Sequence, residues 1–432
     1  MSRISAAGQE TETEPALTKQ RVFLFSALCC LVYFTSYMTR LNYGAAISEI
    51  ADSLAISNQA AGMALIGGFI AYGAGQPIFG LLGDRVKPRY MITAGLTATA
   101  VCNLAVSALH DISVITVVWC FNGFFQAMLW PPLVRIMAQT LTSENYRRAS
   151  VSVFTASSAG TIAVYLLVPL CIWLSGWRLA FVATAALGLG IAAVWFVGVK
   201  GFAVREWIVD EKAVERPVRE STGALVMASG LLPIMLVVVL QGALRDGITT
   251  WMPTYLNEVY RFGNSISILS TAILPVFAIV SVSAASFVQR LIGNELKTVA
   301  CIWGIALAAA AGLTAVYASN AAASLLLMAL LTSCANGINL LLISRLPMHF
   351  AQYGRISTVS GLLNAFAYLG SAVSIYGIAA ISHHFGWKAT IVVWGVIALI
   401  GMLLCALCVR KWGRFTAGGP EKVKVLRVSV ND

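Results

Sequence analysis

The chain has 432 residues, of which 59% are hydrophobic and only 11% are charged. An ordinary soluble chain carries about 25% charged residues, so this composition argues against a water-soluble enzyme, a nucleic-acid-binding protein and a disordered chain. The net charge of +11 does not by itself indicate an acidic partner, because excess Lys and Arg orient the spans of a membrane protein.

Twelve apolar runs follow one another along the chain, and each supplies the roughly 20 residues that a membrane-spanning helix needs. We expect helices, because unpaired backbone groups are not tolerated in lipid. The alternating segments of about ten residues that are typical of outer-membrane barrels are absent. The expected spans cover residues 22–48, 59–82, 91–109, 114–138, 150–174, 178–199, 225–256, 266–288, 298–318, 321–343, 356–381 and 388–409.

A polar stretch after the sixth run divides the spans into two sets of six. The sequence therefore predicts an all-α integral membrane protein with twelve transmembrane helices in two six-helix bundles. The expected segments are a tail at 1–21, a bundle at 22–199, a linker at 200–224, a bundle at 225–409 and a tail at 410–432.

The positive charges are distributed unevenly between the two sides of the expected spans. Of 29 Lys and Arg residues, 24 lie on the side that holds both tails and the linker, and only three lie in loops on the other side. Because loops rich in Lys and Arg stay in the cytoplasm, we expect both termini to be cytoplasmic.

Three short patterns of the first half recur in the second half at offsets of 207 to 214 residues. The pairs are Gly176-Trp177-Arg178 with Gly386-Trp387-Lys388, Asn122-Gly123 with Asn336-Gly337, and Arg148-x-Ser150 with Arg355-x-Ser357. A parallel repeat of six helices is the plan of the major facilitator transporters, whose substrate site lies near the bilayer midplane between the halves.

Two arginines lie inside expected spans, Arg40 in the first and Arg245 in the seventh, at a repeat-like offset of 205 residues. An Arg at a helix centre costs roughly 2.5–3.5 kcal/mol on insertion scales, and so it normally faces a cavity. Guanidinium groups bind phosphate or carboxylate through two parallel hydrogen bonds. We therefore expect both arginines to face a central cavity and to bind an anion.

Asp246 directly follows the second arginine. Neighbouring residues on a helix do not face the same way, so three roles stay open: a structural ion pair, tuning of Arg245, or carriage of a coupling proton. No other carboxylate and no histidine lies deep in a span. This scarcity of proton-relay residues favours anion exchange over proton coupling.

The loop between the second and third expected spans reads Gly80-x-x-x-Asp84-Arg85-x-x-x-Arg89. An acid and two bases at a helix end predict a cytoplasmic gate formed by Asp84, Arg85 and Arg89, and the pattern resembles the loop signature of the major facilitator superfamily. The nine cysteines show no spacing typical of a disulfide framework or a metal site. We expect no metal and no cofactor.

Five further patterns are shared with one transporter family. They are Tyr33-x-x-x-Tyr37-x-x-Arg40-x-Asn42, Ala71-Tyr72-Gly73, Phe125-Gln126-x-Met128-x-Trp130-Pro131-Pro132, Leu244-Arg245-x-Gly247-x-x-x-Trp251-x-Pro253-x-Tyr255-Leu256 and Tyr368-Leu369-Gly370. Through them, residues 30 to 405 resemble the organophosphate:phosphate antiporter family, which includes bacterial glycerol-3-phosphate and hexose-phosphate transporters. The resemblance implies that Arg40 and Arg245 bind the substrate and that four tyrosines line the cavity: Tyr33, Tyr37, Tyr72 and Tyr368.

The chain departs from this family at four expected cavity positions. Gln76 replaces a common Lys, Ser158 a His, and Gly242 and Asn336 each replace a Tyr. We expect a pocket with less charge and bulk, and hence a substrate that is larger or whose anionic group is less charged than phosphate. Gln76, Ser158 and Asn336 would donate neutral hydrogen bonds to it.

The sequence thus predicts a monomeric secondary transporter, not an enzyme, that exchanges a small anionic organic solute by alternating access. The resemblance places it in the lipid bilayer of a bacterial inner membrane, with no nucleic-acid partner. Two alternatives stay open. One is a proton-coupled organic anion symporter with Asp246 as the proton site, and the other is a transporter-like sensor of sugar phosphates.

Overall fold

The computed structural model describes residues 17–202, 222–262, 270 and 273–417, and the regular secondary structure in this part of the chain is helical. Eleven of its helical segments are long and apolar enough to cross a membrane. In chain order the helices are α1 (Lys19–Ala45), α2 (Ile47–Ser53), α3 (Asn58–Gly83), α4 (Pro88–Ala108), α5 (Ile112–Gln126), α6 (Trp130–Thr140), α7 (Ser143–Ser175), α8 (Trp177–Gly198), η1 (Val199–Gly201), α10 (Thr222–Ser229), α11 (Leu231–Tyr260), α13 (Ile273–Ile292), α14 (Glu295–Val316), α15 (Ala321–Asn339), η2 (Leu340–Arg345), η3 (Leu346–Tyr353) and α16 (Ile356–Ala417).

The longest helix, α16, is two helices joined at Gly386, where the backbone has φ 77° and ψ 175°. Counted as two, it gives the described residues twelve apolar segments, in agreement with the predicted number. Gly176, the repeat partner of Gly386, has φ 93° and ψ 173° directly before α8. The two Gly-Trp patterns therefore make the same turn before the last span of each half, because glycine tolerates a positive φ without steric cost.

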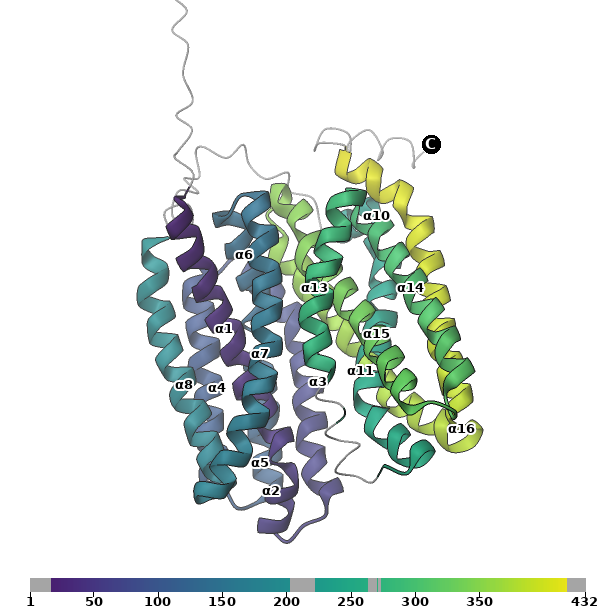
Figure 1. The fold of residues 1–432 in the computed structure, drawn as a ribbon. Helices are drawn as coiled ribbons and strands as arrows, with labels where there is room; N and C mark the ends of the chain where they lie inside the picture. The colour runs from purple at the N-terminus through teal and green to yellow at the C-terminus, as the bar shows by residue number, and fades with distance from the viewer. Residues whose placement is uncertain (1–16, 203–221, 263–269, 271–272, 418–432) are drawn as a thin grey trace, which may run out of the picture.

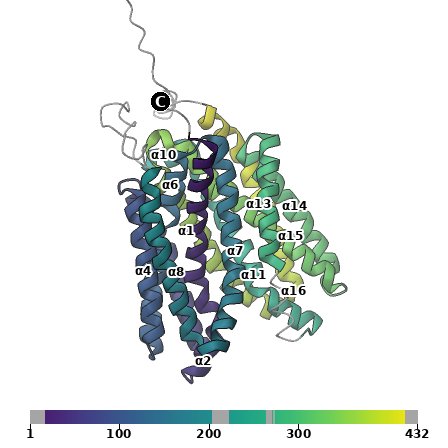
Figure 2. The same cartoon turned by 60° about the vertical axis from the view of Figure 1, so that its left-hand side comes forward.

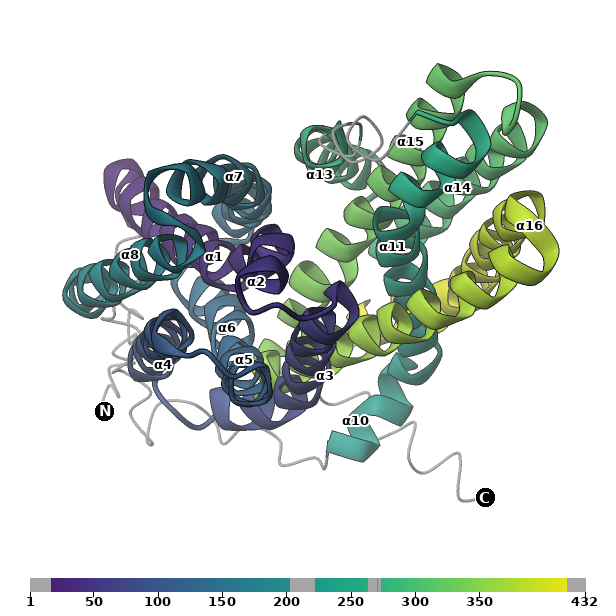
Figure 3. The same ribbon diagram turned by 90° about the horizontal axis from the view of Figure 1, so that it is seen from below.

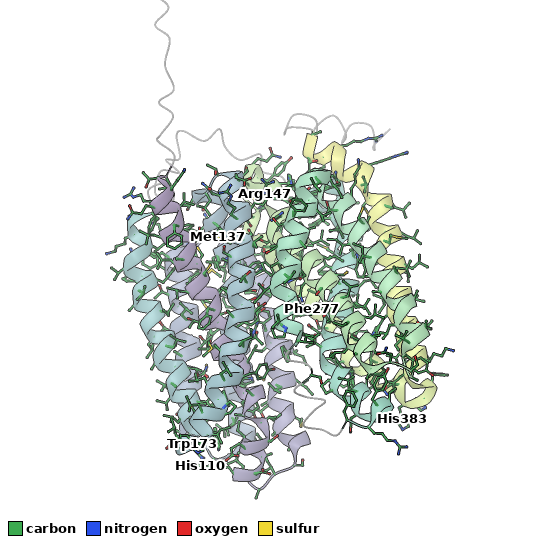
Figure 4. All side chains as sticks on the ribbon, in the orientation of Figure 1. His110, Met137, Arg147, Trp173, Phe277 and His383 are labelled. Atoms are coloured by element: carbon green, nitrogen blue, oxygen red, sulfur yellow. The ribbon has the colours of Figure 1, made fainter. Side chains whose placement is uncertain are left out.

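The helices form two groups, α1 to α8 and α10 to α16, which stand side by side (Figure 1; viewed from below in Figure 3). The groups meet where α3 packs against α16 and where α7 packs against α13. The start of α1 and the end of α16 lie at one end of the molecule, which we call the tail end (Figure 2). Arg147 lies near the tail end, whereas His110 and His383 lie at the opposite, distal end (Figure 4).

Helix starts carry the side-chain caps that such positions favour. Ser57 accepts a hydrogen bond from the Ala60 N–H, Asp111 accepts two from Ser113 and Val114, and Thr142 accepts one from Asn145. Each cap satisfies backbone donors that have no partner within the helix. The fourth predicted span is broken between α5 and α6, directly before the paired prolines of α6, because proline cannot donate the helical hydrogen bond.

A buried polar cluster fixes the helix that carries Arg40. Asn42 of α1 donates to Asn103 of α4 (2.7 Å), and Gln126 of α5 donates to the Thr39 hydroxyl (2.8 Å). These side chains are almost fully buried. Because a buried polar group is costly unless it is hydrogen-bonded, the cluster holds α1 in one register against α4 and α5.

The predicted segment boundaries differ from the helices by a few residues. Helix α1 already begins at Lys19, inside the expected tail, and α16 continues to Ala417, beyond the expected end of the second bundle. Most of both expected tails, and residues 203–221 of the expected linker, lie outside the described residues.

Candidate substrate-binding site

A cavity of about 590 Å³ lies between the two halves. Both intramembrane arginines line it, and so do Ser158 of α7, Asn336 of α15 and Tyr368 of α16. The lining also contains many apolar side chains from α3, α13 and α16. A concave site with few polar groups in a largely apolar wall is typical of small-molecule binding sites.

Arg40 lies in a cage of tyrosines. Its Cζ is 4.5 Å from the ring centroid of Tyr37 and 4.9 Å from that of Tyr72. Its Nη1 donates to the hydroxyl of Tyr368 across the two halves (3.2 Å), and its buried Nε has no hydrogen-bond partner among the described residues. The aromatic faces hold the cation in place, and the guanidinium lines the cavity without an ion pair among the described residues.

Arg245 is arranged differently, because its own neighbour occupies it. Its Nε donates to Oδ1 of Asp246 (2.6 Å) and its Nη2 to Oδ2 (2.8 Å). The hydroxyl of Ser371 also donates to Oδ2 of this carboxylate. Of the three roles left open for Asp246, the geometry thus shows a bidentate ion pair with Arg245. Although neighbouring residues on a helix do not face the same way, the long arginine side chain reaches back to the carboxylate.

Close backbone packing brings Asp246 to Ser371. A Cβ added at Gly242 of α11 would lie 2.0 Å from the Ala367 carbonyl oxygen, and one added at Gly370 of α16 would lie 1.9 Å from the Val239 oxygen. Only glycine fits such contacts. The expectation that Gly242 leaves extra room in the pocket is therefore wrong, because the backbone of α16 fills that space.

The other expected site residues divide into two groups. Tyr37, Ser158, Asn336 and Tyr368 line the cavity, as both arginines do. Tyr33, Tyr72 and Gln76 lie behind its wall. Tyr33 packs on Tyr37 and Trp130, and Tyr72 lies between Arg40 and the ring of Tyr368.

Gln76 is completely buried where α3 meets α16. Within the described residues neither polar atom of its side-chain amide has a hydrogen-bond partner. A Cβ added at Gly361 of α16 would lie 2.3 Å from the backbone carbonyl oxygen of Gln76. In this conformation the residue belongs to the contact between the halves and not to the cavity lining.

Asp84 forms the strongest link between the halves at the tail end. Its carboxylate accepts from the Ser357 N–H (2.8 Å), the Thr358 N–H (2.9 Å) and the Thr358 hydroxyl (2.5 Å). An acid of the first half therefore caps the first turn of α16 in the second half, where the helix dipole favours negative charge. Burial raises the pKa of this carboxyl above its usual value, although the bonds from Thr358 and Ser357 act in the opposite direction.

The two arginines predicted to share this gate do not contact Asp84. Arg89 donates to the Phe196 carbonyl (2.9 Å) and stacks on the Phe196 ring inside the first half, and Arg85 is exposed. Arg135 holds the loop instead, by donating to the Gly83 carbonyl (2.6 Å).

Sequence reasoning missed other bonds between the halves at the tail end. Tyr146 donates to the Ser344 carbonyl (2.6 Å), Ser344 donates to the Ser150 hydroxyl (3.2 Å), and Arg345 donates to the Arg147 carbonyl (3.4 Å). Ser150 belongs to the Arg148-x-Ser150 repeat pattern, but no pattern in the sequence indicates that it contacts Ser344 or that Tyr146 and Arg345 bond across the halves. The cavity lining, in contrast, continues from the arginines toward the distal end, through Tyr165 and Thr250.

The chain matches the family model described as Major Facilitator Superfamily over residues 29–375. The glycerol-3-phosphate transporter of Bacillus subtilis is 26% identical over 275 residues, which is 59% of this chain and 61% of that protein. The membrane sensor protein UhpC of Salmonella typhimurium is 26% identical over 164 residues, or 38% of this chain and 37% of that protein. These matches confirm the resemblance to organophosphate transporters that the sequence patterns predicted.

A solved structure shares the fold over nearly the whole chain. The human organic anion transporter MFSD10 superposes with a TM-score of 0.69 at 15% identity, and covers 90% of this chain and 100% of its own. The predicted all-α major facilitator fold is thereby confirmed. The matched region spans less than two thirds of the curated relatives' own length.

Proposed function

Because the chain belongs to the Major Facilitator Superfamily, we propose that it carries a small organic anion across the membrane by alternating access, with Arg40 as the principal anion-binding group. The observation that carries this proposal is the cation at the cavity wall, with no acidic partner among the described residues. A cation without an ion pair at membrane depth costs free energy, and binding an anion offsets that cost. The prediction that the chain is not an enzyme is confirmed by its family and relatives.

We place the tail end in the cytoplasm, following the asymmetry of Lys and Arg residues. The hydrogen bonds between the halves then close the cytoplasmic side, and the cavity extends toward the outside. In alternating access the two halves rock about the site, so the inward-facing state requires the Asp84 bonds to break. The similarity to a glycerol-3-phosphate transporter supports an organic phosphate or a related anion as the substrate class and exchange as the mode.

Exchange by the reconstituted full-length protein tests this proposal. Liposomes loaded with one unlabelled anion take up a labelled anion from a panel of phosphate esters, phosphonates and carboxylates. Arg40→Gln removes charge-assisted hydrogen bonds worth about 1.5–3 kcal/mol, and so uptake at limiting substrate falls about 10- to 100-fold. Arg40→Lys keeps the charge but lacks the planar fork, and should retain intermediate activity.

Lys388→Gln is the matched control, because this exposed lysine lies at the distal end, outside the cavity lining. It removes one positive charge and should leave exchange unchanged. Arg40→Gln exchange at the wild-type rate for every anion of the panel contradicts the assignment of the site.

A sensor of an external anion is the second candidate, favoured by the similarity to a membrane sensor protein. A sensor would bind an anion at Arg40 without exchange, so saturable binding together with zero flux separates it from a transporter. Proton-coupled symport has less support, because both oxygens of Asp246 already accept hydrogen bonds.

A further inference from the structure

The two cavity arginines offer an anion very different amounts of charge. The cationic charge of Arg245 is balanced by Asp246 through two short hydrogen bonds, whereas Arg40 faces only tyrosine rings and a tyrosine hydroxyl. These three residues are the ionised side chains that line the cavity in the described part of the chain. The cavity wall therefore carries a net charge of about one positive unit.

The structure holds Asp246 firmly in this arrangement. Ser371 donates to the same carboxylate from α16, and the glycines at 242 and 370 let the backbones of α11 and α16 approach closely enough for this contact. A bidentate pair between Arg and a carboxylate is among the strongest polar contacts in proteins. An entering anion must therefore break this pair before it can use the full fork of Arg245.

We propose that Asp246 sets the charge of the substrate, so that the site accepts anions with one negative charge and discriminates against phosphate monoesters with two. The accepted class includes carboxylates, phosphodiesters and singly ionised phosphonates. This inference rests on the proposed function, since it describes the anion that Arg40 binds. In a cavity with low-dielectric walls, a second negative charge without a counter-charge is strongly unfavourable.

Two matched ligand pairs test the inference with the full-length protein at pH 8. One is glycerol 3-phosphate with its methyl diester, and the other is phenyl phosphate with methyl phenyl phosphate. At this pH each monoester carries nearly two charges, because its second pKa is about 6, and each diester carries one. Dissociation constants come from ligand-induced thermal stabilisation, with Arg40→Gln as the measure of binding outside the site.

The inference predicts that wild type binds the diester of a pair at least about tenfold more tightly than the monoester, a difference of about 1.4 kcal/mol. Asp246→Asn removes one negative charge, and should bring the two affinities level or reverse their order. Asp246→Glu keeps the charge, and should keep the preference for the diester. If Asp246→Asn does not fold, the wild-type ratio and the Asp246→Glu ratio still decide.

Equal binding of the two esters by wild type, or tighter binding of the monoester, overturns the inference. If Arg40→Gln no longer binds these esters, the proposed function stands although the inference fails. A diester preference that survives in folded Asp246→Asn also overturns the role of Asp246. If none of the four esters binds wild type better than Arg40→Gln, the inference and the anion site at Arg40 both fail.

Discussion

Arg40 and Arg245 occupy corresponding places in the two repeats but have opposite surroundings. Three tyrosines contact Arg40, while a carboxylate takes two of the three nitrogens of Arg245. The duplicated fold supplies the position of each cation, and the adjacent residues decide whether it is available to a ligand. We infer that one arginine binds the anion and the other anchors Asp246.

The helices that carry these arginines also differ in how closely they pack against their neighbours. At Gly160, where α7 meets α1, an added Cβ would lie 2.8 Å from the Phe34 carbonyl oxygen. At Gly370, where α16 meets α11, the corresponding distance to the Val239 oxygen is 1.9 Å. The Arg245 side of the cavity is therefore packed more closely, backbone against backbone.

Gly370→Ala should have the largest effect. The added methyl group forces two helices apart, and overpacking of this kind costs typically 1–3 kcal/mol and here at least about 3 kcal/mol, because the clash is with backbone. Thermal unfolding of the purified protein measures the loss. Gly377→Ala is the matched control on the same helix, since no atom lies within 4 Å of its added Cβ. Equal melting temperatures for the two variants contradict the close approach.

Arg245→Gln should destabilise the protein by about 2 kcal/mol, because it leaves Asp246 without its counter-ion. The cost stays below that of a fully buried pair, since the side chains of Arg245 and Asp246 are 17% and 27% exposed. Arg40→Gln removes no ion pair and should cost less than about 1 kcal/mol. Adding Asp246→Asn to Arg245→Gln should restore most of the lost stability, and failure to do so argues against the pair.

Asp84→Ala removes three hydrogen bonds between the halves, which are worth about 1 kcal/mol each, and should populate the state that is open at the tail end. Spin labels at Trp173 and Phe385, both exposed near the distal end, should then show shorter distances in a background without the native cysteines. Asp111→Ala is the control, because this carboxylate caps a helix within one half. Unchanged distances in Asp84→Ala argue against a gate at this residue.

Acidification should shift the equilibrium between the two conformations by less than about 1 kcal/mol, and the same spin-label distances should therefore change slightly. Burial raises the pKa of Asp84 in the latched state, in which Asp84 bonds to α16 and the tail end is closed. This state therefore binds a proton more readily than a state with Asp84 in water. The resulting preference for the latched state is fully present below the ordinary pKa of about 3.9, and is lost as the pH rises through the raised value. The distances between the distal-end labels should therefore lengthen as the pH falls from about 7 to about 4 in wild type, but not in Asp84→Asn. Shortening in wild type contradicts this sign.

The helices could be predicted from the sequence because the bilayer allows few solutions. Apolar runs of sufficient length must be helical in lipid, and the recurrence of the Gly-Trp pattern at Gly176 and Gly386 indicates the repeat from the sequence alone. That Arg40 and Arg245 line one cavity also follows from the repeat together with the cost of a buried charge.

Other features depend on three-dimensional detail that no pattern encodes. The pairing of Asp246 with Arg245 requires a particular arginine rotamer, and the burial of Gln76 at the α3–α16 contact depends on which conformation the two halves adopt. A glycine at position 242 predicts free space in the pocket, because the sequence alone does not show that the backbone of α16 fills this space. Each of these differences lies where the two halves or two close helices meet.

The most direct test of the central claim compares exchange by Arg40→Gln with exchange by Arg245→Gln/Asp246→Asn, using the methyl diester of glycerol 3-phosphate. Both proteins lose one arginine, but only the double variant keeps a net charge of about one positive unit in the cavity. The account predicts that the double variant keeps well above a tenth of the wild-type rate, while the rate of Arg40→Gln falls about 10- to 100-fold. A double variant as inactive as Arg40→Gln, or an Arg40→Gln variant as active as the double variant, would contradict the claim that the two arginines have different roles.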